Sequence, residues 1–199
     1  YLALALGRLE SPPAETVAAL SAALDDPDSE TVISVIWALA LLGEETVVPH
    51  IVGMFGAQDP GVRKMAVYAL GVLPDDGSHT TLRAALDDPV PDVQWNAAVS
   101  LARHGDGRGV TVLRRMLDRD YVTRQVTPSG TLADPVSDVM ISGLQAVAAL
   151  GAISLGENLR APVAALADAD PSLKVRQAAM ETIDALESSP ISRNVAERQ

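Results

Sequence analysis

An Asp-Pro pair occurs five times in the sequence, and each pair is followed by a stretch with helical periodicity. The pairs begin at Asp26, Asp59, Asp88, Asp134 and Asp170, at intervals of 33, 29, 46 and 36 residues. Asp accepts hydrogen bonds from the free amide groups at a helix start, and the fixed φ of Pro suits the first helical turn. A helix start repeated at this spacing restricts the chain to a tandem array of similar helical units.

The stretches align without gaps and share a pattern of residue size. They are TVISVIWALALLG (31–43), VRKMAVYALGVLP (62–74), VQWNAAVSLARHG (93–105), VMISGLQAVAALG (139–151) and VRQAAMETIDALE (175–187). The eighth position is always small and the ninth always aliphatic, which predicts close approach between neighbouring helices. Gly43, Gly105 and Gly151 stand where a helix commonly ends in a left-handed residue.

Shorter segments with apolar residues three and four apart lie between these stretches, so each unit is predicted to be a helical hairpin. A pair of about 30 residues cannot bury its own apolar stripe, and stacked pairs must share a core. We therefore predict an all-α solenoid of about five hairpins, forming one domain over residues 1–199. Its parts are a partial repeat (1–10), helix pairs (about 13–43, 45–74, 77–105, 108–151 and 157–187), an inserted loop (119–133) and a polar tail (188–199).

These stretches resemble the HEAT repeat family, in particular the short bacterial phycobilisome-lyase HEAT-like repeats, whose pattern is approximately D-P-x-V-R-x-x-A-A-x-A-L-G-x-L-G. The resemblance covers about residues 1–187 and implies a right-handed α–α superhelix with an armadillo-like helical fold. In the family, the Arg after Val helps to tie adjacent turns together. This Arg is present as Arg63 and Arg176 but is replaced by Val32, Gln94 and Met140. We therefore expect the charged ladder to be broken at the three replaced positions, where packing must hold the joints.

Aromatic residues point to a binding surface on the second helix of each pair. A rotation of 100° per residue separates positions 3, 4, 7 and 11 from the core side, and the resemblance implies that this face lines the concave groove of a solenoid. Trp37 and Tyr68 take position 7 and Trp95 takes position 3. The predicted binding residues are Trp37, Tyr68, Trp95, Met65, Asn96, Leu41 and Val99. Two alternatives remain open, namely local packing of these rings and a phase error in the alignment.

Arginines concentrate around the longest interval between Asp-Pro pairs. Residues 103–124 contain six of them, against Asp106, Asp118 and Asp120. A cluster of guanidinium groups can bind a carboxylate or phosphate. The candidate anion patch is Arg103, Arg114, Arg115, Arg119 and Arg124. The alternative is an ordinary solvated surface with internal pairing to acidic residues.

Charge and composition exclude several functional classes. The net charge of −11 disfavours duplex nucleic acid and anionic membranes as partners. No apolar run reaches the roughly 18 residues of a membrane span, and the absence of cysteine excludes disulfides and thiolate metal sites. His50, His79 and His104 lack metal-ligand spacing, and no nucleophile elbow, P-loop or dinucleotide motif occurs. We expect no cofactor and no metal.

The leading hypothesis is a non-catalytic scaffold that binds a protein or peptide in its groove. One alternative is the bilin lyase or chromophore-handling activity for which the repeat family is named. A less favoured one is nucleic-acid binding, as in HEAT-like DNA glycosylases, whose grooves are basic. The chain begins at Tyr1 in what resembles the end of a helix, which predicts that an upstream segment has been removed. We expect a soluble, cytoplasmic protein.

Overall fold

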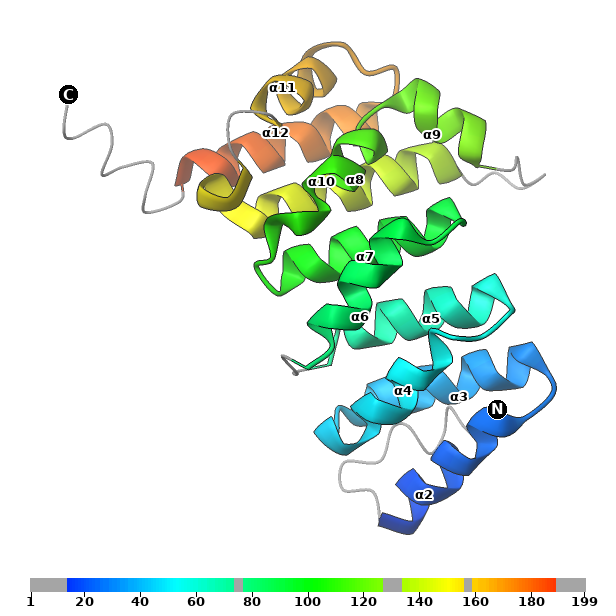
Figure 1. Ribbon diagram of the computed structural model, residues 1–199. Helices are drawn as coiled ribbons and strands as arrows, with labels where there is room; N and C mark the ends of the chain where they lie inside the picture. The colour runs from blue at the N-terminus through cyan, green and yellow to red at the C-terminus, as the bar shows by residue number, and fades with distance from the viewer. Residues whose placement is uncertain (1–13, 74–76, 127–133, 156–158, 189–199) are drawn as a thin grey trace. The chain divides into compact units, whose positions relative to one another are not determined.

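The computed structural model describes residues 14–73, 77–126, 134–155 and 159–188 (Figure 1). Within these ranges the regular elements are eleven α-helices and several short 3-10 turns, with no strand. The predicted all-α fold class is therefore confirmed. The chain divides into two units, residues 1–100 and residues 101–199. The partial repeat at 1–10 and residues 127–133 and 189–199 of the predicted insertion and tail lie outside the described residues.

The first unit consists of helices from consecutive hairpins. They are α2 (Ala14–Ala22), α3 (Ser29–Leu42), α4 (Val48–Met54), α5 (Pro60–Leu70), α6 (His79–Ala84) and residues 91–100 of α7 (Pro91–Arg103). Helix α3 packs against α2 and α5, and α5 also packs against α4 and α6 (Figure 1). The second helices of successive pairs therefore lie side by side.

The predicted Asp-Pro start is confirmed at α5, which begins at Pro60. It is wrong at α3, which begins at Ser29, two residues after Pro27. Asp28 is the N-cap of α3, and its side chain accepts the N–H of Thr31 at 2.9 Å. Asp59 caps α5 by accepting the N–H groups of Gly61 and Val62. Gly43 ends α3 with φ of 69°. This left-handed conformation is unfavourable for residues with a Cβ but is readily adopted by glycine.

Small residues let the second helices approach closely, as the sequence predicted. Ser100 of α7 is buried at the eighth position of its stretch, and its hydroxyl donates to the carbonyl of Val67 in α5 at 3.1 Å. A Cβ on Gly71 would lie 2.9 Å from the Cα of Ser100 and closer still to its side chain. The second unit repeats this contact, because the Thr182 hydroxyl donates to the Leu144 carbonyl at 3.3 Å.

The second unit begins with the end of α7 and contains the remaining helices. These are α8 (Val110–Met116), α9 (Arg119–Gln125), α10 (Pro135–Leu155), α11 (Arg160–Ala169) and α12 (Leu173–Ser188). Helix α10 packs against α8, α9 and α12, and α12 also packs against α11 (Figure 1). Gly151, with φ of 66° and ψ of 176°, interrupts α10 where the sequence predicted a helix end.

The prediction that the insertion is a loop from residue 119 onward is wrong, because residues 119–125 form α9. The helix has its own local signals. Asp118 caps it by accepting the Tyr121 N–H at 2.9 Å, and Val122 on its inner side is fully buried. Residues 127–133 of the predicted loop lie outside the described residues.

Candidate functional site

Two aromatic rings meet on the surface of the first unit. Trp37 of α3 and Tyr68 of α5 stack with ring centroids 5.6 Å apart and an interplanar angle of 26°. Both residues are half-buried. Leu41 follows Trp37 in α3, and Val72 follows Tyr68 in the turn after α5; each is 44% exposed. We call these four residues the aromatic face.

Helix packing explains why the rings meet. Both rings occupy the seventh position of adjacent stretches, so the contact between α3 and α5 places them opposite each other. The positions that face the core differ sharply: Ile36, Ala38 and Leu39 have no exposed surface. An aromatic pair of this kind is stabilised by about 0.5–1.5 kcal/mol beyond its area burial. The pair is therefore held in place while part of each ring stays accessible.

Trp95 does not join this face, and its expected outward orientation is wrong. It lies in the first turns of α7 and is only 5% exposed. Its indole N–H is buried and has no hydrogen-bond partner in the part of the chain that the structure describes. Helical phase fixes the direction of the Cα–Cβ bond, but a long indole can turn back over its own helix toward apolar neighbours. Of the three predicted rings, only two are accessible.

The other predicted binding residues, Met65, Asn96 and Val99, are half-buried. The Asn96 side chain donates to the carbonyl of Asp92 in its own helix at 2.8 Å. Lys64 of α5 approaches the Asp92 carboxylate at 3.4 Å, and both side chains are substantially exposed. An exposed pair of this kind contributes little to stability. The structure thus places polar groups near the apolar ones.

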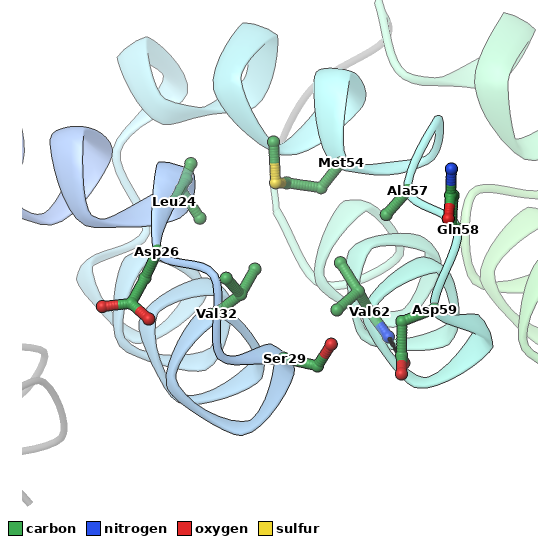
Figure 2. Close-up of a pocket in the computed structure, with 9 residues that line it drawn as sticks. All are labelled: Leu24, Asp26, Ser29, Val32, Met54, Ala57, Gln58, Asp59 and Val62. Carbon is green, nitrogen blue, oxygen red and sulfur yellow. Dashed lines mark hydrogen bonds between the residues drawn. The ribbon is translucent and has the colours of Figure 1, made fainter.

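The first unit also has an open pocket of about 590 Å³ at the opposite end of α3 from Leu41 (Figure 2). Its walls come from the segments that precede α3 and α5 and from the first turns of those helices. The lining residues are Leu24, Asp26, Ser29, Val32, Met54, Ala57, Gln58, Asp59 and Val62. In the second unit, a smaller pocket of about 180 Å³ lies between α11 and α12.

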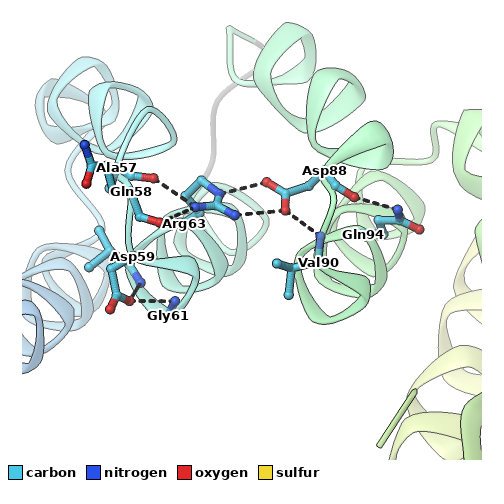
Figure 3. A network of polar contacts seen from close by, with 9 residues as sticks. Ala57, Gln58, Asp59, Gly61, Arg63, Asp88, Val90 and Gln94 are labelled. Carbon is cyan, nitrogen blue, oxygen red and sulfur yellow. Dashed lines mark hydrogen bonds and ion pairs between the residues drawn. The ribbon is translucent and has the colours of Figure 1, made fainter. Parts of the chain in front are cut away.

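Arg63 ties two successive repeats together (Figure 3). Its Nη1 donates to the carbonyls of Ala57 and Gln58 at 2.9 and 2.8 Å, while Nε and Nη2 donate to the two oxygens of Asp88 at 2.8 and 3.1 Å. Burial of the Asp88 carboxyl opposes its ionisation. The hydrogen bonds from Arg63 and from the Val90 N–H, with the charge of Arg63, outweigh burial and hold the pKa of Asp88 below its ordinary value.

Arg119 makes the same type of contact in the second unit. Its Nε and Nη2 donate to the two oxygens of Asp170 at 2.9 and 2.7 Å. Asp170 precedes α12 as Asp88 precedes α7, whereas Met140 occupies the ladder position of α10. The expectation that packing alone holds this joint is therefore wrong. An arginine from the inserted segment takes the place of the missing ladder arginine.

The predicted anion patch is accordingly reduced. Arg119 is bound to an internal carboxylate, and the guanidinium of Arg115 lies 5.9 Å from the centroid of the Tyr121 ring. Arg103, Arg114 and Arg124 are exposed. For these three, anion binding stays a prediction.

The described residues contain no group of three or more His, Asp or Glu side chains placed to hold a metal ion. Over the same residues, no helix is both long and apolar enough to cross a membrane.

A profile of HEAT repeats matches residues 1–71 and 53–127. This chain belongs to the HEAT repeat family. Solved structures agree: the complex of CpcE and CpcF of phycocyanin lyase from Nostoc sp. PCC7120 is similar with a TM-score of 0.66 and 23% identity, over 92% of this chain and 71% of that chain. The resemblance to phycobilisome-lyase HEAT-like repeats is thereby confirmed at the level of fold.

Two similar structures come from designed proteins. An engineered protein matches with a TM-score of 0.56 and 21% identity, over 94% of this chain and 89% of that chain. A computationally designed armadillo repeat protein for modular peptide recognition matches with a TM-score of 0.50 and 16% identity, over 92% and 91%. At these identities the similarity shows the HEAT and armadillo solenoid fold alone. A search of curated protein sequences found no match.

Proposed function

We propose that this HEAT-repeat chain is a non-catalytic interaction module that binds a basic, partly apolar polypeptide segment at the aromatic face. The observation that carries the proposal is the stacked, half-buried pair of Trp37 and Tyr68, flanked by the exposed side chains of Leu41 and Val72. Aromatic residues dominate the energetically important positions of protein interfaces. Exposed apolar side chains grouped beside such rings are typical of a contact surface.

Charge indicates the chemistry of the partner. Residues 1–100 contain 4 Lys and Arg residues and 14 Asp and Glu residues, a net charge of 4 − 14 = −10 out of the total of −11. One of the four basic residues, Arg63, is already paired with Asp88. A surface of this charge attracts basic segments and repels nucleic acid and acidic peptides. The partner is therefore a polypeptide with Lys or Arg near apolar side chains.

The test selects ligands from a random peptide library displayed on phage, using the full chain as bait. Peptides rich in basic and apolar residues are expected. Their affinity for a Leu41→Lys/Val72→Lys variant should be at least about tenfold weaker, since truncating an important contact residue costs about 2 kcal/mol or more. Both side chains are largely exposed, so the fold should tolerate the change.

A matched control makes the same change elsewhere. Leu173 and Met180 of α12 are also exposed large hydrophobic residues, and they belong to the second unit. The Leu173→Lys/Met180→Lys variant should retain full affinity for the selected peptides. Equal binding by all three proteins, or selection of acidic peptides, would refute the proposal.

The flat faces of the stacked rings favour one second candidate, the binding of a bilin-type chromophore. Phycocyanin lyase is also named among the similar structures. Mixing the chain with a free bilin and recording its visible spectrum separates the two functions. The interaction module predicts no shift in the absorbance maximum, whereas a saturable shift that disappears in Trp37→Ser would support chromophore binding.

A further inference from the structure

The position after the first residue of each aligned stretch repeatedly supplies a hydrogen-bond donor to the preceding segment. In the second repeat, Arg63 donates to the carbonyl of Ala57, six residues earlier. In the third repeat, Gln94 donates to the carbonyl of Asp88, also six residues earlier, at 2.6 Å. Two different side chains thus donate to the equivalent backbone carbonyl of successive repeats.

The first repeat lacks this donor. Val32 occupies the position in α3, and the equivalent carbonyl six residues earlier belongs to Asp26. Among the described residues, no hydrogen bond to this carbonyl is found, although the Asp26 side chain accepts the N–H of Asp28. The acidic partner is missing as well, because Ala57 stands where Asp88 stands one repeat later. Both halves of an Arg–Asp pair are therefore absent at this joint.

The open pocket of Figure 2 lies at this joint. Val32 and Val62 face each other across it, with Leu24 and Met54 closing one side, so its inner part is apolar. Its outer part is polar and carries two carboxylates. The polar lining residues are Asp26, Ser29, Gln58 and Asp59. A side chain that fills this pocket needs an apolar stem and a head with several donors.

We propose that the pocket binds the arginine side chain of a partner polypeptide. The guanidinium takes the place that Arg63 occupies one repeat later and that Arg119 supplies in the second unit. It carries five donors in a plane, enough to reach the free carbonyl of Asp26 and a carboxylate at once, whereas lysine offers one compact ammonium group. Its aliphatic stem covers the apolar wall.

The electrostatics of the first unit favour a cation here. The unit has a net charge of −10 over residues 1–100. Asp26 is exposed and has no cationic partner among the described residues. Asp59 accepts two backbone N–H groups on one oxygen. The pocket is separate from the aromatic face, so this site extends the proposed function and does not depend on it.

The test uses methyl NMR spectra of the full chain during titration with acetyl-Gly-Arg-Gly-amide. The methyl signals of Val32, Val62 and Met54 are expected to shift with saturation in the millimolar range, because a single side chain provides few contacts. The citrulline analogue, a neutral isostere, should cause no saturable shift, and the lysine analogue should bind several-fold more weakly. Equal shifts with all three peptides, or none with the arginine peptide, overturn the proposal.

Two arginine substitutions give a matched comparison. Val32→Arg places a tethered guanidinium in the pocket and should abolish the peptide-induced shifts. Gln94→Arg adds the same group at the same position two repeats later and should leave them unchanged. Undiminished binding by a folded Val32→Arg protein contradicts the assignment.

A second variant covers the case in which Val32→Arg fails to fold. Asp26→Asn/Asp59→Asn keeps the side-chain oxygens that accept backbone N–H groups but removes both charges. It should lower the affinity for the arginine peptide at least several-fold. Unchanged affinity in this variant refutes the site. If free L-arginine binds more tightly than the tripeptide, the proposal that the arginine belongs to a polypeptide is refuted. Trp37→Ser/Tyr68→Ser should bind the tripeptide normally, which separates this site from the aromatic face.

Discussion

Arg119→Ala tests the conclusion that the inserted segment stabilises the second unit. The Asp170 side chain is 1% exposed, and its two oxygens accept Nε and Nη2 of Arg119 at 2.9 and 2.7 Å. Removing the guanidinium leaves a buried carboxylate without its cation. The variant is therefore expected to lower the free energy of unfolding of the second unit.

The size of the effect follows from the geometry. Breaking a buried ion pair by removing one partner costs about 3–5 kcal/mol. Two features reduce that figure here: the Arg119 side chain is 25% exposed, and Asp170 keeps the hydrogen bond from the Ser172 N–H at 2.9 Å. We expect a loss of about 2–3 kcal/mol.

Arg124→Ala is the matched control, since it removes an exposed arginine from the same helix. Its effect should stay within about 0.5 kcal/mol. Denaturant unfolding followed by hydrogen exchange of α10 and α12 amides reports on the second unit directly. Tryptophan fluorescence would report on the first unit, because both tryptophans belong to it. Equal stability of the two variants would refute the role assigned to Arg119.

Further changes test the packing and the charge network. Gly71→Ala should lower the unfolding free energy by about 1–3 kcal/mol because a Cβ would overlap Ser100, whereas Gly53→Ala, with nothing within 4 Å of its Cβ, should be neutral or stabilising in thermal melts. The lowered pKa of Asp88 means that the unfolded chain binds more protons at acid pH than the folded chain. The stability that this carboxylate contributes is therefore present above the ordinary Asp pKa of about 3.9 and is lost as pH falls through and below it. In an acid titration followed by circular dichroism, Asp88→Asn should lose less stability on acidification than the unchanged chain. Trp95→Ala should cost about 3–5 kcal/mol in denaturant unfolding, as expected for a core ring.

Local signals in the sequence predicted helix ends better than helix starts, since α3 and α7 begin two residues after the prolines of their Asp-Pro pairs. Gly43, Gly105 and Gly151 were expected to be left-handed, and they are the glycines with positive φ in the described residues. Such features depend on a few neighbouring residues, because a helix end needs only a residue that tolerates the conformation. The small eighth position likewise predicted close helix approach, which the contact between Ser100 and Val67 shows.

The functional face was predicted only in part. Trp37 and Tyr68 are accessible at the expected positions, and their role in binding stays a proposal. Trp95 shares the same calculated side of its helix but is buried. Periodicity gives the direction in which a side chain leaves the helix. It does not give the rotamer that a large ring adopts among its neighbours.

Internal pairing of the clustered arginines with acidic residues was the alternative drawn from the sequence, but the specific pair of Arg119 and Asp170 was not predicted. Met140 at a ladder position predicted a joint without a charged tie, yet Arg119 supplies one to Asp170, 51 residues away. Alignment of repeats compares equivalent positions, and an arginine from an insertion has no equivalent in the other repeats. The pocket beside Val32 likewise could not be predicted from the sequence, because it depends on how α3 and α5 pack where the contacts of Arg63 have no counterpart.

Acrylamide quenching of a single-tryptophan protein addresses the accessible aromatic pair most directly. Trp95→Phe leaves Trp37 as the remaining indole, and Trp37→Phe leaves Trp95. Emission from Trp37 should lie to the red of that from Trp95, be quenched more strongly, and become protected when a selected basic peptide binds. Equal shielding of the two indoles, or no protection of Trp37 by bound peptide, would contradict the assignment of this surface.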